Sequence, residues 1–358
     1  MESVNLRMRD ELKIHACAQL RGLKAYSWLL QTTRETSPHP LQAKVEITTK
    51  CQLKCPVCYR TNMSVSSVVD GWACHALPSM INRDMTVLEY EHVLDELRGV
   101  AAISPHGWGE PLLHPRFLEM MRMTHRRGMT IHLVTNGLLL TPDIADPFIS
   151  ECHPTGVTFS VDAGEPDAYE RLRLGGKYST FVKNVKSTIT IRDKLSPQTQ
   201  VIFYCTLGTH NLEQIEPLSE LGWKLGVDVI NFSDLTLYNL GIADAQHAIR
   251  TTNMVNHIRE RIAQADCRYA PNTRIVFSGQ KTVGSCMLAW MQILIQVNGD
   301  MSTCACDPAR GNIFQNSFKE LWNNSDTRNF RRQILEGSLA ETTGCYTCIL
   351  YNRCGVKW

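Results

Sequence analysis

Three closely spaced cysteines constrain this chain more than any other feature. Cys51, Cys55 and Cys58 lie in one short segment, directly after the β-branched stretch at residues 45–48. A cubane 4Fe-4S cluster is normally held by four thiolates, so a loop that offers three leaves one iron open to a further ligand. A zinc site is the alternative, but zinc favours paired Cys-x2-Cys half-sites with the fourth ligand in the same module. The triplet therefore favours an iron–sulfur cluster with a reactive iron.

Composition indicates a globular enzyme in a reducing compartment. The chain has 358 residues, 43% of them hydrophobic, and can bury a large core. Its net charge of +2 comes from interspersed acids and bases, which gives no indication of a nucleic-acid partner. We expect no membrane segment and no signal peptide, and hence a cytoplasmic location. The 14 cysteines then favour metal ligands over disulfides.

The middle of the chain alternates strand-like and helix-like segments. Such alternation predicts repeated βα units and a parallel sheet, although the pattern alone does not distinguish a partial barrel from an open sheet. One helix start is well marked, because Thr86 and Glu89 have the spacing of a capping box. The six predicted strands are residues 43–49, 101–106, 130–135, 156–161, 200–207 and 228–232.

Glycines and polar residues follow three of these predicted strands. Glycines let the main chain approach a ligand closely, and a carboxylate favours an ammonium group. If the sheet curls into a barrel, active sites are expected at the C-terminal ends of its strands. The segments are Gly107-Trp108-Gly109-Glu110-Pro111 after the second strand, Thr135-Asn136-Gly137 after the third and Ser160-Val161-Asp162 after the fourth.

The Cys-x3-Cys-x2-Cys spacing and these segments, in this order, resemble the radical S-adenosylmethionine (SAM) enzymes. The resemblance implies an α/β fold with a partial (β/α)6 TIM-like barrel, and a 4Fe-4S cluster on Cys51, Cys55 and Cys58 whose fourth iron binds SAM. It also implies reductive cleavage of SAM to a 5′-deoxyadenosyl radical, which abstracts a hydrogen atom from the substrate. The electron donor would be a flavodoxin- or ferredoxin-like protein. The implied SAM contacts are Gly107, Gly109, Glu110, Pro111, Thr135, Asn136, Ser160 and Asp162. Tyr59 or Trp108 would replace the aromatic residue that the family usually has at Val57.

The C-terminal third contains a second group of cysteines around a predicted hairpin. Asn298-Gly299 between extended segments indicates a two-residue turn, and residues 318–322 predict a short amphipathic helix. This layout resembles the SPASM and twitch extensions, which hold auxiliary 4Fe-4S clusters. A full SPASM domain uses seven or eight cysteines, whereas this region has six, so one fully ligated auxiliary cluster is preferred to two incomplete ones. Its implied ligands are Cys286, Cys304, Cys345 and Cys348, with Cys354 as a further candidate at a SPASM spacing.

We therefore expect three parts: an N-terminal helical segment at 1–42, the radical SAM barrel at 43–265 and the SPASM/twitch domain at 266–358. The first 42 residues are too short for a full peptide-recognition domain, which favours a small polar, sugar- or aminocyclitol-like substrate. Net oxidation would use the auxiliary cluster as electron acceptor, with Asp307, Arg310 or Asp234 as base.

Three alternatives stay open. The first is a peptide maturase that crosslinks or epimerises a ribosomal peptide. The second is a radical sugar epimerase in which Cys306 donates the hydrogen atom. The third is an electron-transfer or iron–sulfur scaffold protein, which the SAM-contact motifs argue against, since an electron carrier needs no open iron beside a carboxylate.

Overall fold

The computed structural model describes residues 35–62, 82–234, 252–278, 288–303, 309–336 and 338. Their strands form one sheet in the order β7-β6-β5-β4-β3-β2-β1-β8-β9. All neighbouring strands are parallel except β8 and β9, which are antiparallel. The strands are β1 Gln42–Val45, β2 Ala102–Ser104, β3 Thr130–Thr135, β4 Gly156–Ser160, β5 Gln200–Leu207, β6 Val229–Asp234, β7 Arg274–Phe277, β8 Gln292–Ile295 and β9 Met301–Ser302.

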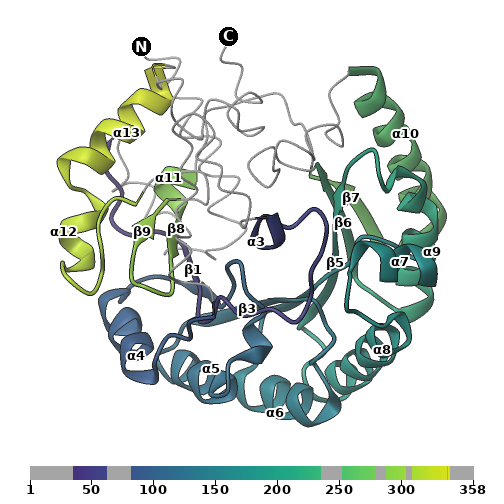
Figure 1. Cartoon of the computed structure of the whole chain (residues 1–358), viewed down its shortest axis with the longest axis horizontal. Helices are drawn as coiled ribbons and strands as arrows, with labels where there is room; N and C mark the ends of the chain where they lie inside the picture. The colour runs from purple at the N-terminus through teal and green to yellow at the C-terminus, as the bar shows by residue number, and fades with distance from the viewer. Residues whose placement is uncertain are drawn as a thin grey trace.

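Helices follow most of the parallel strands and lie outside the curved sheet, which stays open between its two edges (Figure 1). This is the partial barrel expected from the sequence, and all six predicted strands are present. The described helices are α3 Tyr59–Asn62, α4 Val87–Glu96, η2 Pro111–Leu113, α5 Phe117–Arg126, α6 Pro142–Cys152, α7 Pro166–Leu172, α8 Tyr178–Leu195, η3 Leu212–Gln214, α9 Ile215–Leu225, α10 Thr252–Tyr269, α11 Leu288–Met291, α12 Phe318–Trp322 and α13 Ser325–Glu336.

Buried and more exposed residues alternate along the strands, which gives the sheet an apolar outer face and a more polar inner face. In β1, β3 and β5 every second residue is buried, and these residues form the core between the sheet and the helices. Phe159, Phe181 and Phe203 pack together there, from β4, α8 and β5. The residues between them, such as Lys44 and His132, face the concave side. The concave side is therefore available for polar contacts.

Two parallel strands extend the sheet beyond the six that the sequence predicts. β7 pairs with β6 at one edge, and β8 pairs with β1 in the register Gln42↔Gln292 to Val45↔Ile295. The sequence marked β8 only as one arm of a hairpin. The structure shows that this arm joins the barrel, which places the hairpin directly against the strand that leads to the cysteine triplet.

The hairpin between β8 and β9 exists, but its turn is longer than the two residues expected. Gly299 N donates to Gln296 O over 2.8 Å, and Gln296 N donates to Asp300 O over 2.9 Å. Gly299 has φ +88°, whereas Asn298 is not in the left-handed region. The connection is thus a β-turn followed by a glycine bulge. Asn298 stabilises it through its side chain, which accepts from Asp300 N at 3.2 Å.

Two further local predictions are confirmed. Two others, the domain boundary and the N-terminal helix, stay predictions. The capping box of Thr86 and Glu89 is present at the start of α4, and residues 318–322 form α12. The predicted boundary at 265/266 falls inside α10, so the division into domains stays a prediction. The N-terminal helix predicted within 1–42 falls almost entirely outside the described residues. None of the helices in the described part of the chain is long and apolar enough to cross a membrane.

Candidate functional site

The cysteine triplet lies in the connection between β1 and α3, on the concave side of the sheet (Figure 1). Main-chain bonds hold this loop. Cys58 N donates to Cys55 O over 3.1 Å, and Lys54 N donates to Leu174 O over 2.9 Å. Cys55 is buried, whereas Cys51 and Cys58 are partly exposed. These bonds therefore hold the loop in place, while Cys51 and Cys58 remain partly exposed.

The electrostatics of the loop favour a bound cationic group. The pKa of Cys51 is raised, and that of Cys55 is raised to about 11; burial is the largest cause of both shifts, and the neighbouring cysteines contribute to them. Thiols that oppose each other's ionisation become thiolates when a metal centre supplies positive charge. In a cubane each thiolate binds a different iron, and the three thiols of this loop are the donors that a cluster with one open iron requires.

The glycine segment after β2 lies directly on the segment that leads into Cys51. A Cβ on Gly109 would lie 2.2 Å from Thr48 O and 2.8 Å from Lys50 O, so only glycine fits there without a shift of the main chain. Glu110 N donates to Lys50 O over 2.7 Å. The close approach that the sequence suggested thus serves first to join two loops of the protein, and it brings main-chain groups next to the cysteines.

Glu110 is 3% exposed and organises the end of β3. Its Oε1 accepts from Thr135 Oγ1 at 2.7 Å and from Leu112 N at 3.2 Å, and its Oε2 accepts from Asn136 N at 2.7 Å. Burial raises the pKa of Glu110, and these bonds oppose the rise. A carboxylate has about four acceptor positions, so about one is left for an ammonium group. Pro111 begins η2 and is buried beside it.

Asn136 joins the end of β3 to the cysteine loop. Its side-chain amide pairs with that of Gln52, with N–O distances of 3.1 and 3.3 Å. Its Oδ1 also accepts from Leu138 N at 3.1 Å. Thr135 and Asn136, both predicted as SAM contacts, are thus buried and bonded to Glu110 and Gln52. Together they fix the relative positions of three strand ends.

Asp162, after β4, forms a buried ion pair with Arg173. Arg173 Nε lies 2.8 Å from Asp162 Oδ2, and Asp162 Oδ1 accepts from Thr206 N at 3.2 Å. Arg173 also lowers the pKa of Cys55, which places its positive charge near the triplet. Both oxygens of Asp162 are engaged. The group that could attract an anionic ligand near Asp162 is therefore the guanidinium of Arg173. Arg173 was not among the predicted site residues; its only sequence signal is the basic segment Arg171-Leu172-Arg173.

A second residue that the sequence reasoning missed is Glu46 on the concave face of the sheet. Glu46 is 2% exposed, and its Oε1 accepts from Trp108 N at 2.7 Å. Burial raises its pKa. The sequence signal is a single charge in the apolar run Val45-Glu46-Ile47. This residue lies between β8 and the glycine segment.

The remaining predicted site residues are only partly described. Ser160 ends β4, opposite Tyr204 of β5, and is partly exposed. Tyr59 is the first residue of α3 and Asp234 the last of β6, but their side chains lie outside the described part. The same holds for the whole of Cys286, Cys304, Cys306, Asp307, Cys345, Cys348 and Cys354, whose roles stay predictions.

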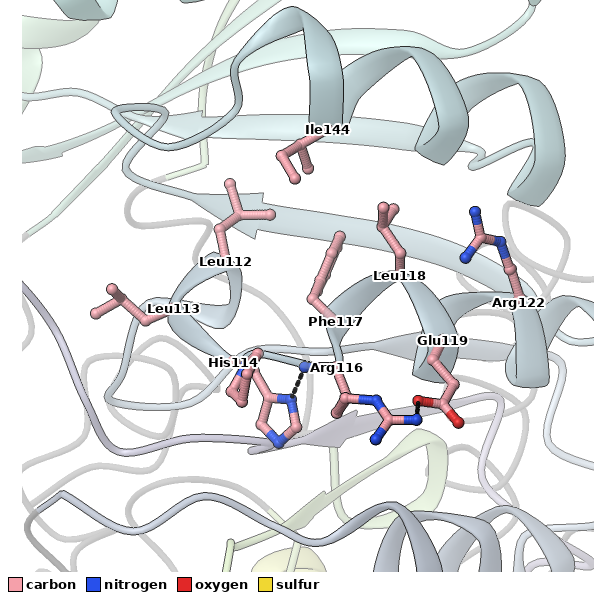
Figure 2. A pocket seen from close by; sticks show the side chains of 10 residues that line it. Leu112, Leu113, His114, Arg116, Phe117, Leu118, Glu119, Arg122 and Ile144 are labelled. Atoms are coloured by element: carbon pink, nitrogen blue, oxygen red, sulfur yellow. Dashed lines mark hydrogen bonds and ion pairs between the residues drawn. The ribbon is translucent and has the colours of Figure 1, made fainter.

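A pocket follows the glycine segment in the chain, where η2, α5 and α6 meet (Figure 2). Figure 2 shows Leu112, Phe117, Leu118 and Ile144 around one space. Its charged groups are paired, since Arg122 contacts Glu151 and Arg116 contacts Glu119. None of the predicted site residues that the structure describes lines it. The pocket is therefore distinct from the cysteine loop.

Comparison with known proteins agrees with this geometry. The sequence model of the Radical SAM superfamily matches residues 45–222, and that of an iron-sulfur cluster-binding domain, SPASM, matches residues 286–349. The first range includes the cysteine triplet and every predicted SAM contact. The second begins at Cys286 and includes Cys304, Cys345 and Cys348, with Cys354 beyond it.

Two curated proteins resemble the chain in sequence. The PqqA peptide cyclase of Ruegeria pomeroyi is 23% identical over 234 residues, which cover 65% of this chain and 57% of the cyclase. The tungsten-containing aldehyde ferredoxin oxidoreductase cofactor-modifying protein of Pyrococcus furiosus is 28% identical over 196 residues, 53% of this chain and 50% of that protein. The chain thus spans about half the length of these relatives.

Solved structures share the fold. SuiB of Streptococcus suis, bound to the precursor peptide SuiA, superimposes with a TM-score of 0.66 at 14% identity, over 91% of this chain and 74% of SuiB. The enzyme anSMEcpe, with AdoMet and the Cp18Cys peptide bound, gives a TM-score of 0.61 at 17% identity, over 88% of each chain.

The cofactors follow from the two family matches and from the donors in the cysteine loop. They are SAM, a 4Fe-4S cluster on the barrel and auxiliary iron–sulfur binding in the C-terminal third. The chain belongs to the radical SAM superfamily and carries a C-terminal SPASM iron–sulfur domain.

Proposed function

We propose that the chain is a radical SAM peptide maturase, which joins two positions of a ribosomally made peptide. The observation that carries this proposal is the similarity to the PqqA peptide cyclase over 65% of the chain. SuiB, which shares the fold, has a precursor peptide bound, and this supports a peptide as substrate. The relatives therefore favour the peptide alternative over the sugar- or aminocyclitol-like substrate that the sequence suggested.

The described residues have distinct parts in this function. When bound, the three-cysteine cluster and SAM supply an electron and the 5′-deoxyadenosyl radical. Cys51, Cys55 and Cys58 would each hold one iron, and Glu110 would offer its remaining acceptor position to the ammonium of SAM. Arg173 would attract the SAM carboxylate. These residues hold the reactants in a fixed orientation, which reduces the entropic part of the barrier.

The concave face offers hydrogen-bonding groups to a peptide. Tyr204 and Thr206 alternate with buried residues along β5 and are partly exposed, as is Ser160 on β4. A peptide main chain carries a donor and an acceptor at almost every residue, so a polar wall suits it. We propose this wall as the place where the peptide lies.

A crosslink removes two hydrogen atoms from the peptide. The 5′-deoxyadenosyl radical takes one as a hydrogen atom, and the other leaves as a proton and an electron, so the reaction needs a base and an electron acceptor. Asp307 and Asp234 are proposed as bases. An auxiliary 4Fe-4S cluster on Cys286, Cys304, Cys345 and Cys348 is proposed as the acceptor, and a flavodoxin- or ferredoxin-like protein as the source of the first electron.

The test uses the anaerobically reconstituted enzyme with SAM, a reductant and synthetic peptides encoded by short reading frames next to its gene. We expect one of these peptides to become lighter by two hydrogen atoms while 5′-deoxyadenosine accumulates in equal amount. Cys348→Ala should still cleave SAM but form no crosslink. Oxidation of a sugar or aminocyclitol, with every peptide unchanged, would overturn the proposal.

The epimerase alternative predicts a different product. In deuterated water an epimerised product would carry one solvent deuterium at the altered carbon and would lose no hydrogen atoms overall. Cys306→Ala would abolish that incorporation if Cys306 donates the hydrogen atom. A product without solvent deuterium, formed equally well by Cys306→Ala, agrees with the crosslinking proposal.

A further inference from the structure

The side chain of Glu46 connects segments that are far apart in the sequence. Its Oε1 accepts from Trp108 N at 2.7 Å, and its Oε2 lies 3.4 Å from Val297 N, in the turn between β8 and β9. Its own main-chain N donates to Ile295 O over 2.8 Å. One buried carboxylate thus contacts both the glycine segment and the hairpin that lies within the SPASM match.

Gly107 of the glycine segment packs against the side chain of Glu46. A Cβ at Gly107 would lie 2.5 Å from Glu46 Oε1 and 2.6 Å from its Cβ and Cγ, so the glycine segment rests directly on this side chain. Two residues further along the same segment, Gly109 rests on Thr48 O. The position of the glycine segment is therefore set at two points by the residues that follow β1, and of these Glu46 also reaches the hairpin.

We propose that Glu46 is a positioning residue that couples the SAM site to the auxiliary iron–sulfur domain. It fixes the glycine segment, which leads to Glu110, relative to the β8–β9 hairpin. Cys304 follows β9 by two residues in the sequence, so the hairpin leads directly to this proposed auxiliary ligand. The coupling concerns the two cofactor sites and holds whichever substrate the enzyme takes.

A carboxylate suits this role because it only accepts hydrogen bonds. The two groups that face it are both main-chain N–H donors, and a buried donor without an acceptor destabilises the protein. A glutamine of nearly the same shape can satisfy only one of them, because its amide nitrogen would face the other N–H. Glu46→Gln therefore breaks one arm of the bridge with little change in volume.

Val297→Pro breaks the arm to the hairpin without touching the carboxylate. Val297 is the second residue of the turn from Gln296 to Gly299, a position where proline is favoured. Proline has no N–H, so this variant removes the donor to Glu46 Oε2 and leaves the bond from Trp108 N in place. It serves as the second variant if Glu46→Gln fails to fold.

The experiment measures amide hydrogen exchange in the reconstituted protein, with and without SAM and without reductant. In the wild type we expect SAM to slow exchange in both segments 107–110 and 296–302. In Val297→Pro, SAM should still protect 107–110 but no longer protect the hairpin. In Glu46→Gln both effects should weaken, and the Kd for SAM, measured by calorimetry, should rise about tenfold, with the iron content unchanged.

Asp228→Asn is the matched control. Asp228 Oδ2 also accepts a main-chain N–H, that of Val201 at 2.7 Å, and pairs with Arg192, but it lies at the opposite end of the sheet, just before β6. We expect Asp228→Asn to alter exchange near Val201 and Arg192 only, with the Kd for SAM unchanged. The proposal is wrong if SAM does not protect the hairpin of the wild type. It is also wrong if SAM protects the hairpin of Glu46→Gln and of Val297→Pro as strongly as that of the wild type. A loss of stability in Glu46→Gln with an unchanged Kd would likewise reduce Glu46 to a structural residue.

Discussion

At the scale of single residues, the site is built from buried charges that are satisfied inside the protein. Glu46, Glu110 and Asp162 are all below 5% exposed, and each accepts at least two hydrogen bonds or ion-pair contacts. A buried charge without a partner is strongly unfavourable. These residues therefore determine the positions of their partners, which are main-chain groups of the cofactor loops and the side chains of Thr135 and Arg173.

The pair of Asp162 and Arg173 gives the first prediction. Arg173→Met should lower the free energy of unfolding by about 3–5 kcal/mol, because it leaves the carboxylate of Asp162 buried beside Thr206 N without its cation. Urea denaturation of the metal-free protein measures this loss. Adding Asp162→Asn should recover part of it.

An exposed ion pair is the control for that measurement. Arg122→Ala removes the pair with Glu151, in which both side chains are more than a third exposed, and should change stability by less than about 1 kcal/mol. Equal losses in Arg173→Met and Arg122→Ala would show that Asp162 does not depend on Arg173.

His132 on β3 gives a prediction about pH. Burial lowers its pKa from 6.5 to about 4, and its Nε2 is hydrogen-bonded to Thr158 Oγ1 at 2.8 Å. The unfolded chain binds a proton near pH 6.5, whereas the folded protein does so only near pH 4. Stability therefore falls as the pH drops through this window, by up to about 3 kcal/mol.

The comparison with His132→Gln isolates this effect. The free energy of unfolding of the wild type minus that of the variant should decrease between pH 7 and pH 4, as urea denaturation at each pH would show. A difference that is constant with pH would mean that His132 is as easily protonated in the folded protein as in the unfolded chain.

At the scale of elements, strand ends and the loops that follow them create the site. Parallel pairing brings the ends of β1, β2, β3 and β4 to one edge of the sheet, and the loops then bond to each other through Glu110, Asn136 and Gln52. The helices outside the sheet supply the core and leave the concave face polar. The loops are consequently more constrained than their glycine content suggests.

The glycine segment after β2 tests this constraint. In Gly109→Ala the new Cβ would meet main-chain atoms, Thr48 O at 2.2 Å and Lys50 O at 2.8 Å, which cannot rotate away as a side chain can. We expect a stability loss of about 2 kcal/mol or more, from overpacking, and at least tenfold weaker SAM binding by calorimetry.

Gly128→Ala provides the comparison. Gly128 has φ +74°, but no atom lies within 4 Å of the place that a Cβ would take, so the variant should lose only about 1 kcal/mol and should bind SAM normally. Unchanged SAM affinity in Gly109→Ala would show that the segment can move off β1 without harm to the site.

At the scale of the whole molecule, one sheet carries both iron–sulfur regions. β8 pairs with β1, so the barrel and the beginning of the SPASM match share a strand interface and are not joined only by a linker. Buried residues of β8, β9 and α12 belong to the same hydrophobic cluster as those of the barrel. The two cofactor regions should therefore fold together.

Iron content tests this organisation. The reconstituted protein should bind about eight irons, as two four-iron clusters, because seven of the cysteines at cluster spacings suffice for a three-cysteine and a four-cysteine site. Replacement of Cys51, Cys55 and Cys58 by alanine together should leave about four irons and abolish 5′-deoxyadenosine formation. About twelve irons in the wild type would indicate two auxiliary clusters, and 5′-deoxyadenosine formation by the triple variant would refute the site.

The sequence by itself determined the local features. The cysteine spacing, the capping box of Thr86 and Glu89 and the alternation of strands and helices depend on residues that are close along the chain, so they were readable without a structure. The family resemblance added the order of the motifs and the site at the strand ends. The partial barrel and its first six parallel strands followed from these two sources.

Only the tertiary structure decided which distant segments meet. That β8 joins β1, that Glu46 contacts both Trp108 and Val297, and that Arg173 pairs with Asp162 beside Cys55 are contacts between residues of different elements. No local pattern encodes them, because a buried charge shows in the sequence only as a charge. Its partner is selected by packing, which brings the two groups together where water cannot satisfy either of them.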